Sequence, residues 1–288
     1  MEYSLVLFTT FTQLATALAI MTTMVAAWQS KGHIVFQRYF LRITGKACFP
    51  VTALAGLAAF LHLGDPWGAF RAFSHTETSW LSREIWAAAI FGGISLICSY
   101  TWWADRSRLQ TIWWSGAAAV AGLATVFTSS QVYQLQAHAL WNTIFTPLSF
   151  FASTLLFIPA SALALLVWNR KNADGVEDWE KLIGLAAYGI IGAAMVEFIL
   201  IGAQIYVAVG MGDPGLIQYL FVRMGTVYWA RILFSVIIPV LIGSWVLQRS
   251  LYSSVLKPAT ISMLVLVILG ELGGRMIFFS SVMNMPRF

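Results

Sequence analysis

Eight apolar runs follow one another along the chain, each about 20 residues long, the length of helix that crosses the hydrocarbon core of a bilayer. Short charged clusters separate them. In lipid the backbone polar groups must be satisfied within the protein, so we expect helices, since barrel strands would be about 10 residues long with alternating polarity. The predicted spans are residues 3–28, 47–63, 84–103, 110–130, 146–168, 182–208, 228–248 and 259–283.

The composition supports a protein that lies almost entirely in the membrane. Fifty-nine per cent of the residues are apolar and only 10% are charged, whereas a soluble domain carries roughly a quarter charged residues. The first run has no basic flank and is longer than the apolar core of a signal peptide, so we interpret it as a retained span. We therefore expect an all-α integral membrane protein, with residues 1–288 forming a single polytopic domain. The net charge of +5 is then explained by basic residues in loops that orient the protein in the membrane. It gives no reason to expect a nucleic-acid partner.

Lysine and arginine are distributed unevenly between the two sides of the predicted spans. The connections after the first, third, fifth and seventh spans hold eleven of them: Lys31, Arg38, Arg42, Lys46, Arg106, Arg108, Arg170, Lys171, Lys181, Arg249 and Lys257. The opposite side holds five: Arg71, Arg83, Arg223, Arg231 near a span end, and Arg287. Because cytoplasmic loops carry an excess of basic residues, this bias predicts both termini outside the cytoplasm.

His62 and Glu84 stand at adjoining ends of the second and third spans, on the predicted outer side. Gly64 and Pro66 are typical of a helix end, so His62 falls in the last turn. It is either a helix-end hydrogen-bond donor or a group that exchanges protons with a ligand. Ser82 is predicted to cap the third span, which places Glu84 in its first turn. The helix dipole alone favours a carboxylate there, and a functional pairing with His62 is the alternative.

Three further ionisable residues are predicted inside spans. Glu271 and Arg275 are four residues apart on one face of the last span, where they form either a self-neutralising pair or part of a site. Small residues beside them would let a neighbouring helix or a flat ligand approach closely: Gly270, Gly273 and Gly274. Glu197 has no evident local partner, and is either a protonated structural group or part of a proton path with Glu84.

The protein has little equipment for chemistry of its own. A membrane haem usually needs paired intramembrane histidines, and only His62 qualifies, so we expect no haem. Cys48 and Cys98 are too few for a Cys₄ metal or iron–sulfur site, and we interpret them as buried small apolar residues. The sequence has no P-loop, no dinucleotide-binding GxGxxG between a strand and a helix, no HExxH and no serine-nucleophile motif. We therefore predict no metal site in this protein.

Two motifs resemble the membrane anchor subunit of bacterial dimethyl sulfoxide reductases. The segment LHLGDPWGAFRAFSHTETSWLSREI is similar to that family's helix-ending HLG(x)P, followed by AF, a polar stretch and LS(x)E. The C-terminal GELGGRMIFF is similar to its GE(x)xGR(x)(x)F(Y/F) block. Weaker agreement in WNTIFTPLSFF and WARILF extends the resemblance over essentially the whole sequence. The N-terminal start and the loops 131–142 and 209–227 depart from familiar members, which leaves the substrate of the attached enzyme open.

The resemblance implies a fold, partners and a site. The fold is two four-helix bundles without haem, with both termini on the periplasmic side of a bacterial cytoplasmic (inner) membrane. The partners are a catalytic subunit with molybdopterin guanine dinucleotide and an iron–sulfur subunit with 4Fe–4S clusters. The anchor binds menaquinol and passes its electrons to the nearest partner cluster. The candidate quinol-site residues are His62, Glu84, Trp67, Arg71, Glu271 and Arg275.

In the predicted mechanism, His62 accepts a proton from a quinol hydroxyl or hydrogen-bonds to it, and Glu84 relays a proton to the outer aqueous phase. Because this site lies near the outer face, the partner subunits are predicted on the periplasmic face. The complex is predicted to carry out anaerobic respiratory reduction of an S- or N-oxide. Two other interpretations stay open. One is a proton-coupled secondary transporter, and the other is a purely structural membrane anchor.

Overall fold

A computed structural model of the protein describes residues 3–27, 34–62, 73–136, 138, 140–169, 179–212, 217–248 and 255–283, and these contain helices and no strand. The helices are α1 (Tyr3–Ala27), α2 (Ile34–His62), α4 (Trp80–Trp103), α5 (Arg108–Val132), α6 (Phe145–Trp168), α7 (Trp179–Gly210), α9 (Gly225–Ile232), α10 (Ile238–Gln248) and α11 (Leu256–Met283). Two π-helical segments, Tyr219–Arg223 and Leu233–Ile237, flank α9.

Within this described part of the protein, eight helical stretches are long and apolar enough to cross a membrane, which confirms the predicted all-α membrane fold. The seventh stretch, Gly225–Gln248, combines α9, a π-helical turn and α10. Pro239 accounts for the break, because proline has no N–H for the carbonyl four residues earlier, and the wider turn lies directly before it.

The largest difference from the predicted bounds is at the start of α2. α2 begins at Ile34, well before the predicted residue 47. The sequence places the basic residues before residue 47 in a connection because charge is costly in lipid, but long basic side chains on a helix end reach the polar side. Arg42 does so by pairing with Asp105, beyond the end of α4, at 2.8 Å. α7, predicted as residues 182–208, is one continuous helix of 32 residues.

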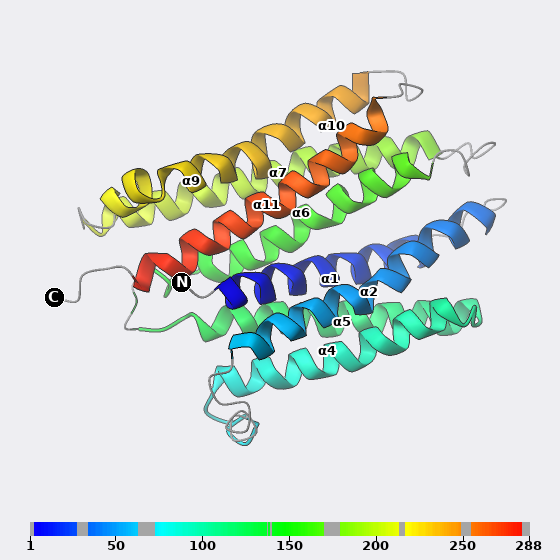
Figure 1. The fold of residues 1–288 in the computed structure, drawn as a ribbon, viewed down its shortest axis with the longest axis horizontal. Helices are drawn as coiled ribbons and strands as arrows, with labels where there is room; N and C mark the ends of the chain where they lie inside the picture. The colour runs from blue at the N-terminus through cyan, green and yellow to red at the C-terminus, as the bar shows by residue number, and fades with distance from the viewer. Residues whose placement is uncertain are drawn as a thin grey trace.

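The helices form two four-helix bundles side by side, as predicted (Figure 1). The first bundle contains α1, α2, α4 and α5, and the second contains α6, α7, α9 with α10, and α11. α1 packs against α6 and α11, and α5 packs against α6, so these helices join the two bundles. α1 begins and α11 ends at the same end of the molecule, which we call the terminal end (Figure 1). α2 also ends there, and α4 begins there.

Small residues set the close packing inside each bundle. A Cβ added at Gly122 of α5 would lie 2.6 Å from the Thr16 hydroxyl oxygen of α1, and one at Gly243 of α10 would lie 2.9 Å from Ile190 of α7. Such contacts require glycine, as expected between helices in lipid. Cys48 and Cys98 are free and buried within the first bundle, as predicted.

Candidate functional site

The start of α4 is fixed by a serine cap one turn earlier than the sequence predicts. Ser79 is the N-cap, and its hydroxyl oxygen accepts a hydrogen bond from the backbone N–H of Ser82 at 3.4 Å. The prediction of Ser82 as the cap is wrong because Trp80, which precedes the predicted span, already belongs to the helix. Glu84 therefore lies beyond the first turn, where the helix dipole has weakened.

Glu84 is directed into the first bundle. Only 5% of this residue is exposed, and its Oε1 accepts a hydrogen bond from Ser129 Oγ of α5 at 2.5 Å. Within the described residues, no basic side chain forms an ion pair with it. A carboxylate inside a membrane-spanning helix is costly and is a functional candidate by default. This environment favours a role for Glu84 beyond stabilising the helix end.

His62 is the last residue of α2, which packs against α4. The ends of these two helices therefore bring the His62 backbone and Glu84 to the same end of the first bundle (Figure 1). The His62 side chain, and Trp67 and Arg71 entirely, lie outside the described residues.

The described part of the connection after α2 folds back onto α4. Arg83 donates hydrogen bonds to the backbone carbonyls of Thr76 and Glu77, both at 2.8 Å. Trp86 donates its indole N–H to the carbonyl of Phe73 at 3.0 Å, and the two rings meet edge to face. This segment is thus held against the first turns of α4, through residues on both sides of Glu84 in the sequence.

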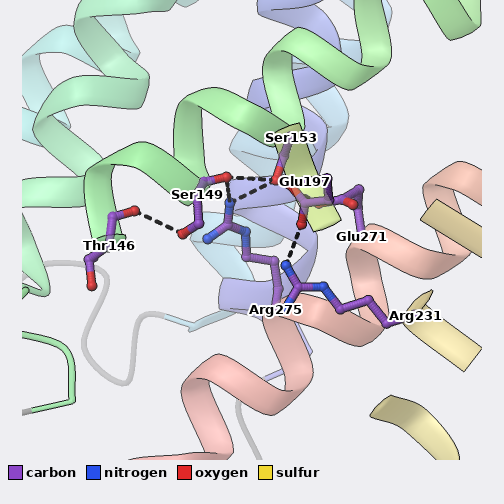
Figure 2. Close-up of polar contacts among 7 residues, drawn as sticks. All are labelled: Thr146, Ser149, Ser153, Glu197, Arg231, Glu271 and Arg275. Atoms are coloured by element: carbon purple, nitrogen blue, oxygen red, sulfur yellow. Dashed lines mark hydrogen bonds and ion pairs between the residues drawn. The ribbon is translucent and has the colours of Figure 1, made fainter. Parts of the chain in front are cut away.

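The second bundle contains a buried cluster of four charged residues, which we call the second-bundle cluster: Glu197, Arg231, Glu271 and Arg275 (Figure 2). Arg231 of α9 pairs with Oε1 of Glu197 on α7. The sequence indicates no local partner for Glu197 because it places Arg231 near a span end. Arg231 lies instead inside the helix and is only 8% exposed.

Glu271 and Arg275 of α11 meet through a serine of α6 (Figure 2). Ser153 Oγ donates to Glu271 Oε2 at 2.6 Å, and Arg275 Nη2 donates to Ser153 Oγ at 3.1 Å and to the Ser149 carbonyl at 3.3 Å. The Arg275 guanidinium also lies over the Phe150 ring, 3.7 Å from its centroid. The two charged residues are therefore linked by Ser153, and within the described residues they form no direct ion pair.

The glycines of α11 allow α9 and the following turn to approach closely, as the sequence predicts. A Cβ on Gly274 would lie 2.7 Å from Arg231 Nε, and one on Gly270 would lie 2.3 Å from Ser235 Oγ. Gly273 faces Val227 of α9. The partner that fits against these glycines is thus a helix that carries one of the four charges.

A cavity of about 70 Å³ borders the second-bundle cluster. The charged or phenolic residues in its wall are Arg231, Glu271, Arg275 and Tyr228, and its other polar residues are Thr146, Ser149, Gln204 and Ser281. Glu271 Oε1 and the Tyr228 hydroxyl have no hydrogen-bond partner within the described residues, although both atoms are buried. The sequence did not indicate Arg231, Tyr228 or Ser153 as site residues. Of the three, only Arg231 lies in a motif that the sequence singled out, WARILF.

The described residues contain no group of three or more histidine, cysteine, aspartate or glutamate side chains that could hold a metal ion. Of the predicted site residues, the structure brings Glu197, Glu271 and Arg275 together. It places Glu84 in the other bundle. A proton path joining Glu84 to Glu197 would therefore have to cross between the bundles.

The family model for the DMSO reductase anchor subunit (DmsC) matches residues 1–280. The protein belongs to the DMSO reductase anchor subunit family. It is 28% identical over 154 residues to the C subunit of the anaerobic dimethyl sulfoxide reductase of Haemophilus influenzae, covering 51% of this protein and 54% of the relative. It is 31% identical over 116 residues to the subunit YnfH of Escherichia coli (38% and 39% covered) and 30% identical over 123 residues to the C subunit of that organism (41% and 42%).

The aligned stretches thus span about half of these curated relatives or less. The match to the family covers nearly the whole sequence, and it confirms the resemblance that the two motifs indicate. With eight helices long and apolar enough to span a bilayer in its described part, this is a multi-pass membrane protein.

Proposed function

We propose that this protein is a haem-free, menaquinol-oxidising membrane anchor of a molybdoenzyme complex. It would lie in a bacterial inner membrane as a single polytopic domain, bind menaquinol near its terminal end, and pass the electrons to an iron–sulfur partner subunit. That partner would carry 4Fe–4S clusters and feed a catalytic subunit with molybdopterin guanine dinucleotide, which reduces an S- or N-oxide. Family membership supports the anchoring role.

The observation that carries the quinol proposal is the buried Glu84 carboxylate at the terminal end of the first bundle, held by a single hydroxyl donor from Ser129. Quinol oxidation releases protons that need an acceptor in the membrane and a route to water. Glu84 would supply that acceptor, and His62, at the end of the packed neighbour α2, would hydrogen-bond to the quinol hydroxyl. Trp67 and Arg71 of the intervening connection would complete the site.

The excess of basic residues on the opposite end supports a periplasmic position for the terminal end and the termini. Arg231 no longer contributes to that comparison, since it is buried within α9. The partner clusters would then dock on the periplasmic face, where the distance from the quinol is shortest. Protons from the quinol would be released on the side where the reductase consumes them.

The test is oxidation of a menaquinol analogue by membranes that contain the whole complex. We expect His62→Ala and Glu84→Gln each to lower the rate by about 10²-fold or more, the usual size of an acid–base contribution. Oxidation of an artificial donor by the catalytic subunit should be unchanged. Glu77→Gln is the matched control, because Glu77 is an exposed acidic residue just before α4.

Unchanged quinol oxidation in both variants would return His62 and Glu84 to helix-end roles, as in a purely structural anchor, and any quinol site would have to be sought around Glu197, Glu271 and Arg275. A proton-coupled transporter is the second candidate, because buried intramembrane charges such as the second-bundle cluster are typical of proton relays. It would act without partner subunits, so purification of the protein is informative. Co-purification with iron and molybdenum supports the anchor, and a protein that purifies and transports alone supports the transporter.

A further inference from the structure

The cavity of about 70 Å³ in the second bundle connects the terminal end of the molecule with Glu271. Leu140 and Leu220, which lie outside the long helices, contribute to its wall, together with Ser281 near the end of α11. Its wall continues inward to Arg231 and Glu271. The cavity therefore spans from the connections at the terminal end to the buried charges.

The size of the cavity favours water over an organic ligand. One water molecule needs on the order of 10–15 Å³ of cavity space, so the cavity has room for several. Pockets for drug-sized ligands are roughly 300–1,000 Å³. Its wall supplies both donors and acceptors, since Arg275 and Tyr228 can donate and Glu271 can accept.

Glu271 has one oxygen held by the protein and one that faces no protein donor. Oε2 accepts from Ser153 Oγ at 2.6 Å, whereas the buried Oε1 has no partner within the described residues. The residue is only 1% exposed and lines the cavity. A buried carboxyl oxygen without a donor is costly, and water in the cavity would satisfy it.

Ser153 is placed to accommodate either protonation state of Glu271. Its hydroxyl lies 2.6 Å from Glu271 Oε2 and 3.0 Å from the Ser149 carbonyl oxygen, and its single proton can point to only one of them. With Glu271 ionised, Ser153 donates to the carboxylate. With Glu271 protonated on Oε1, Ser153 can keep donating to Oε2 or turn its proton to the Ser149 carbonyl.

We propose that the second bundle contains a water-filled proton-exchange site, separate from the quinol site, in which Glu271 is the exchanging carboxyl. The carboxyl O–H bond at Oε1, the oxygen without a protein partner, breaks and its proton passes to a cavity water, then outward past Ser281. The carboxylate left behind is stabilised by the Ser153 hydroxyl and, through Ser153, by Arg275. Re-protonation from the same water reverses the step, and no electron is transferred.

Charged and titratable groups on several helices surround this carboxyl. Arg275 lies one turn further along α11, α9 contributes Arg231 and Tyr228, and α7 contributes Glu197, paired with Arg231. α6 contributes uncharged hydroxyls, and the described part of α1, which also packs on α11, contains no charged side chain. With both arginines and Glu197 charged, ionisation of Glu271 makes the cluster neutral overall.

Hydration is tested by cysteine labelling of the intact complex in membranes. Ile201→Cys places a thiol in the cavity wall, and Ile199→Cys places one on a lipid-facing position two residues away, where the side chain is 63% exposed. A water-soluble thiosulfonate reagent should label the first and not the second, as read by mass spectrometry of this protein. Equal or reversed labelling would overturn the proposal.

Proton exchange is tested by infrared difference spectroscopy of the purified complex transferred from H₂O to D₂O. A carboxyl band that shifts on this exchange and is lost in Glu271→Gln is expected. If Glu271→Gln fails to assemble, Ser153→Ala should shift the frequency of that band, whereas Ser161→Ala, another buried serine of α6, should not. No exchanging band assignable to Glu271 would overturn the proposal, whatever the quinol assay shows.

Discussion

The two bundles bury acidic residues in opposite ways. In the first bundle, Glu84 has a hydroxyl donor from Ser129 and no ion-pair partner among the described residues. In the second bundle, Glu197 and Glu271 are matched by two arginines within one cluster. A carboxylate without a counter-charge can change its protonation state when a substrate arrives. The difference supports substrate chemistry at Glu84, whereas the exchange proposed at Glu271 rests on its unpartnered oxygen and on the cavity beside it.

The largest expected effect is on stability when the arginine of the second-bundle ion pair is removed. Arg231→Gln leaves Glu197 buried without its cation, and breaking such a pair costs about 3–5 kcal/mol. The thermal unfolding midpoint of the purified complex should fall far below that of Arg223→Gln, which changes an exposed arginine. Adding Glu197→Gln to Arg231→Gln should recover part of the loss. Equal midpoints for Arg231→Gln and Arg223→Gln would remove the energetic contrast between the bundles.

A smaller loss is expected when the space beside that arginine is filled. Gly274→Ala would bring a Cβ within 2.7 Å of Arg231 Nε, so the guanidinium must move, at a cost of about 1–3 kcal/mol. Gly202→Ala on α7 is the matched control, because nothing lies within 4 Å of a Cβ there. Unfolding midpoints measured on the same preparation compare the two. An equally large fall in the unfolding midpoint of Gly202→Ala would mean that the close approach of α9 to α11 does not contribute to stability.

In the first bundle, we expect a substitution to lower the rate of quinol oxidation more than it lowers the stability. Ser129→Ala removes the hydrogen-bond donor to Glu84, an interaction worth about 1–3 kcal/mol when it involves a buried charge, so quinol oxidation should fall about tenfold. Ser130→Ala is the control, because that hydroxyl donates to the Phe127 carbonyl of its own helix. The measured quantity is the rate with a menaquinol analogue, divided by the rate with an artificial donor. A normal ratio in Ser129→Ala would contradict a catalytic Glu84.

The smallest stability effect is expected for Glu84→Gln. Glutamine can still accept from Ser129 and carries no charge to bury, so the free energy of unfolding should change by less than about 1 kcal/mol. This result, beside the large loss for Arg231→Gln, would sharpen the comparison of the two bundles. A loss comparable to that of Arg231→Gln would mean that Glu84 is paired as firmly as Glu197. The same thermal unfolding assay measures both.

The sequence predicts the fold well because each span is a long apolar run, and run length alone fixes the number of helices in lipid. It also predicts the close approach of a helix to the glycines of α11. It fails where the decisive fact is a partner on another helix. The pairing of Glu197 with Arg231, and the link between Glu271 and Arg275 through Ser153, join residues far apart in the sequence, and no periodicity encodes them.

The start of α4 shows a second limit. Ser79 and Ser82 both lie near the start of the apolar run. Because Ser79 is the cap, Glu84 lies one turn deeper in the helix than predicted. The burial of Glu84 toward Ser129 depends on how α4 packs against α5, which is a tertiary property. Its position at the terminal end, by contrast, follows from the order of the spans.

The most direct test of the central claim is the binding of a menaquinol analogue to the purified whole complex, with Glu84→Gln compared with Glu271→Gln. We predict that Glu84→Gln weakens binding at least about tenfold, because a neutral amide replaces the carboxylate that would accept the quinol hydroxyl proton, a charged hydrogen bond worth about 1–3 kcal/mol, whereas Glu271→Gln binds as the wild type does. Binding lost in Glu271→Gln and retained in Glu84→Gln would contradict the account and place the quinol in the second bundle.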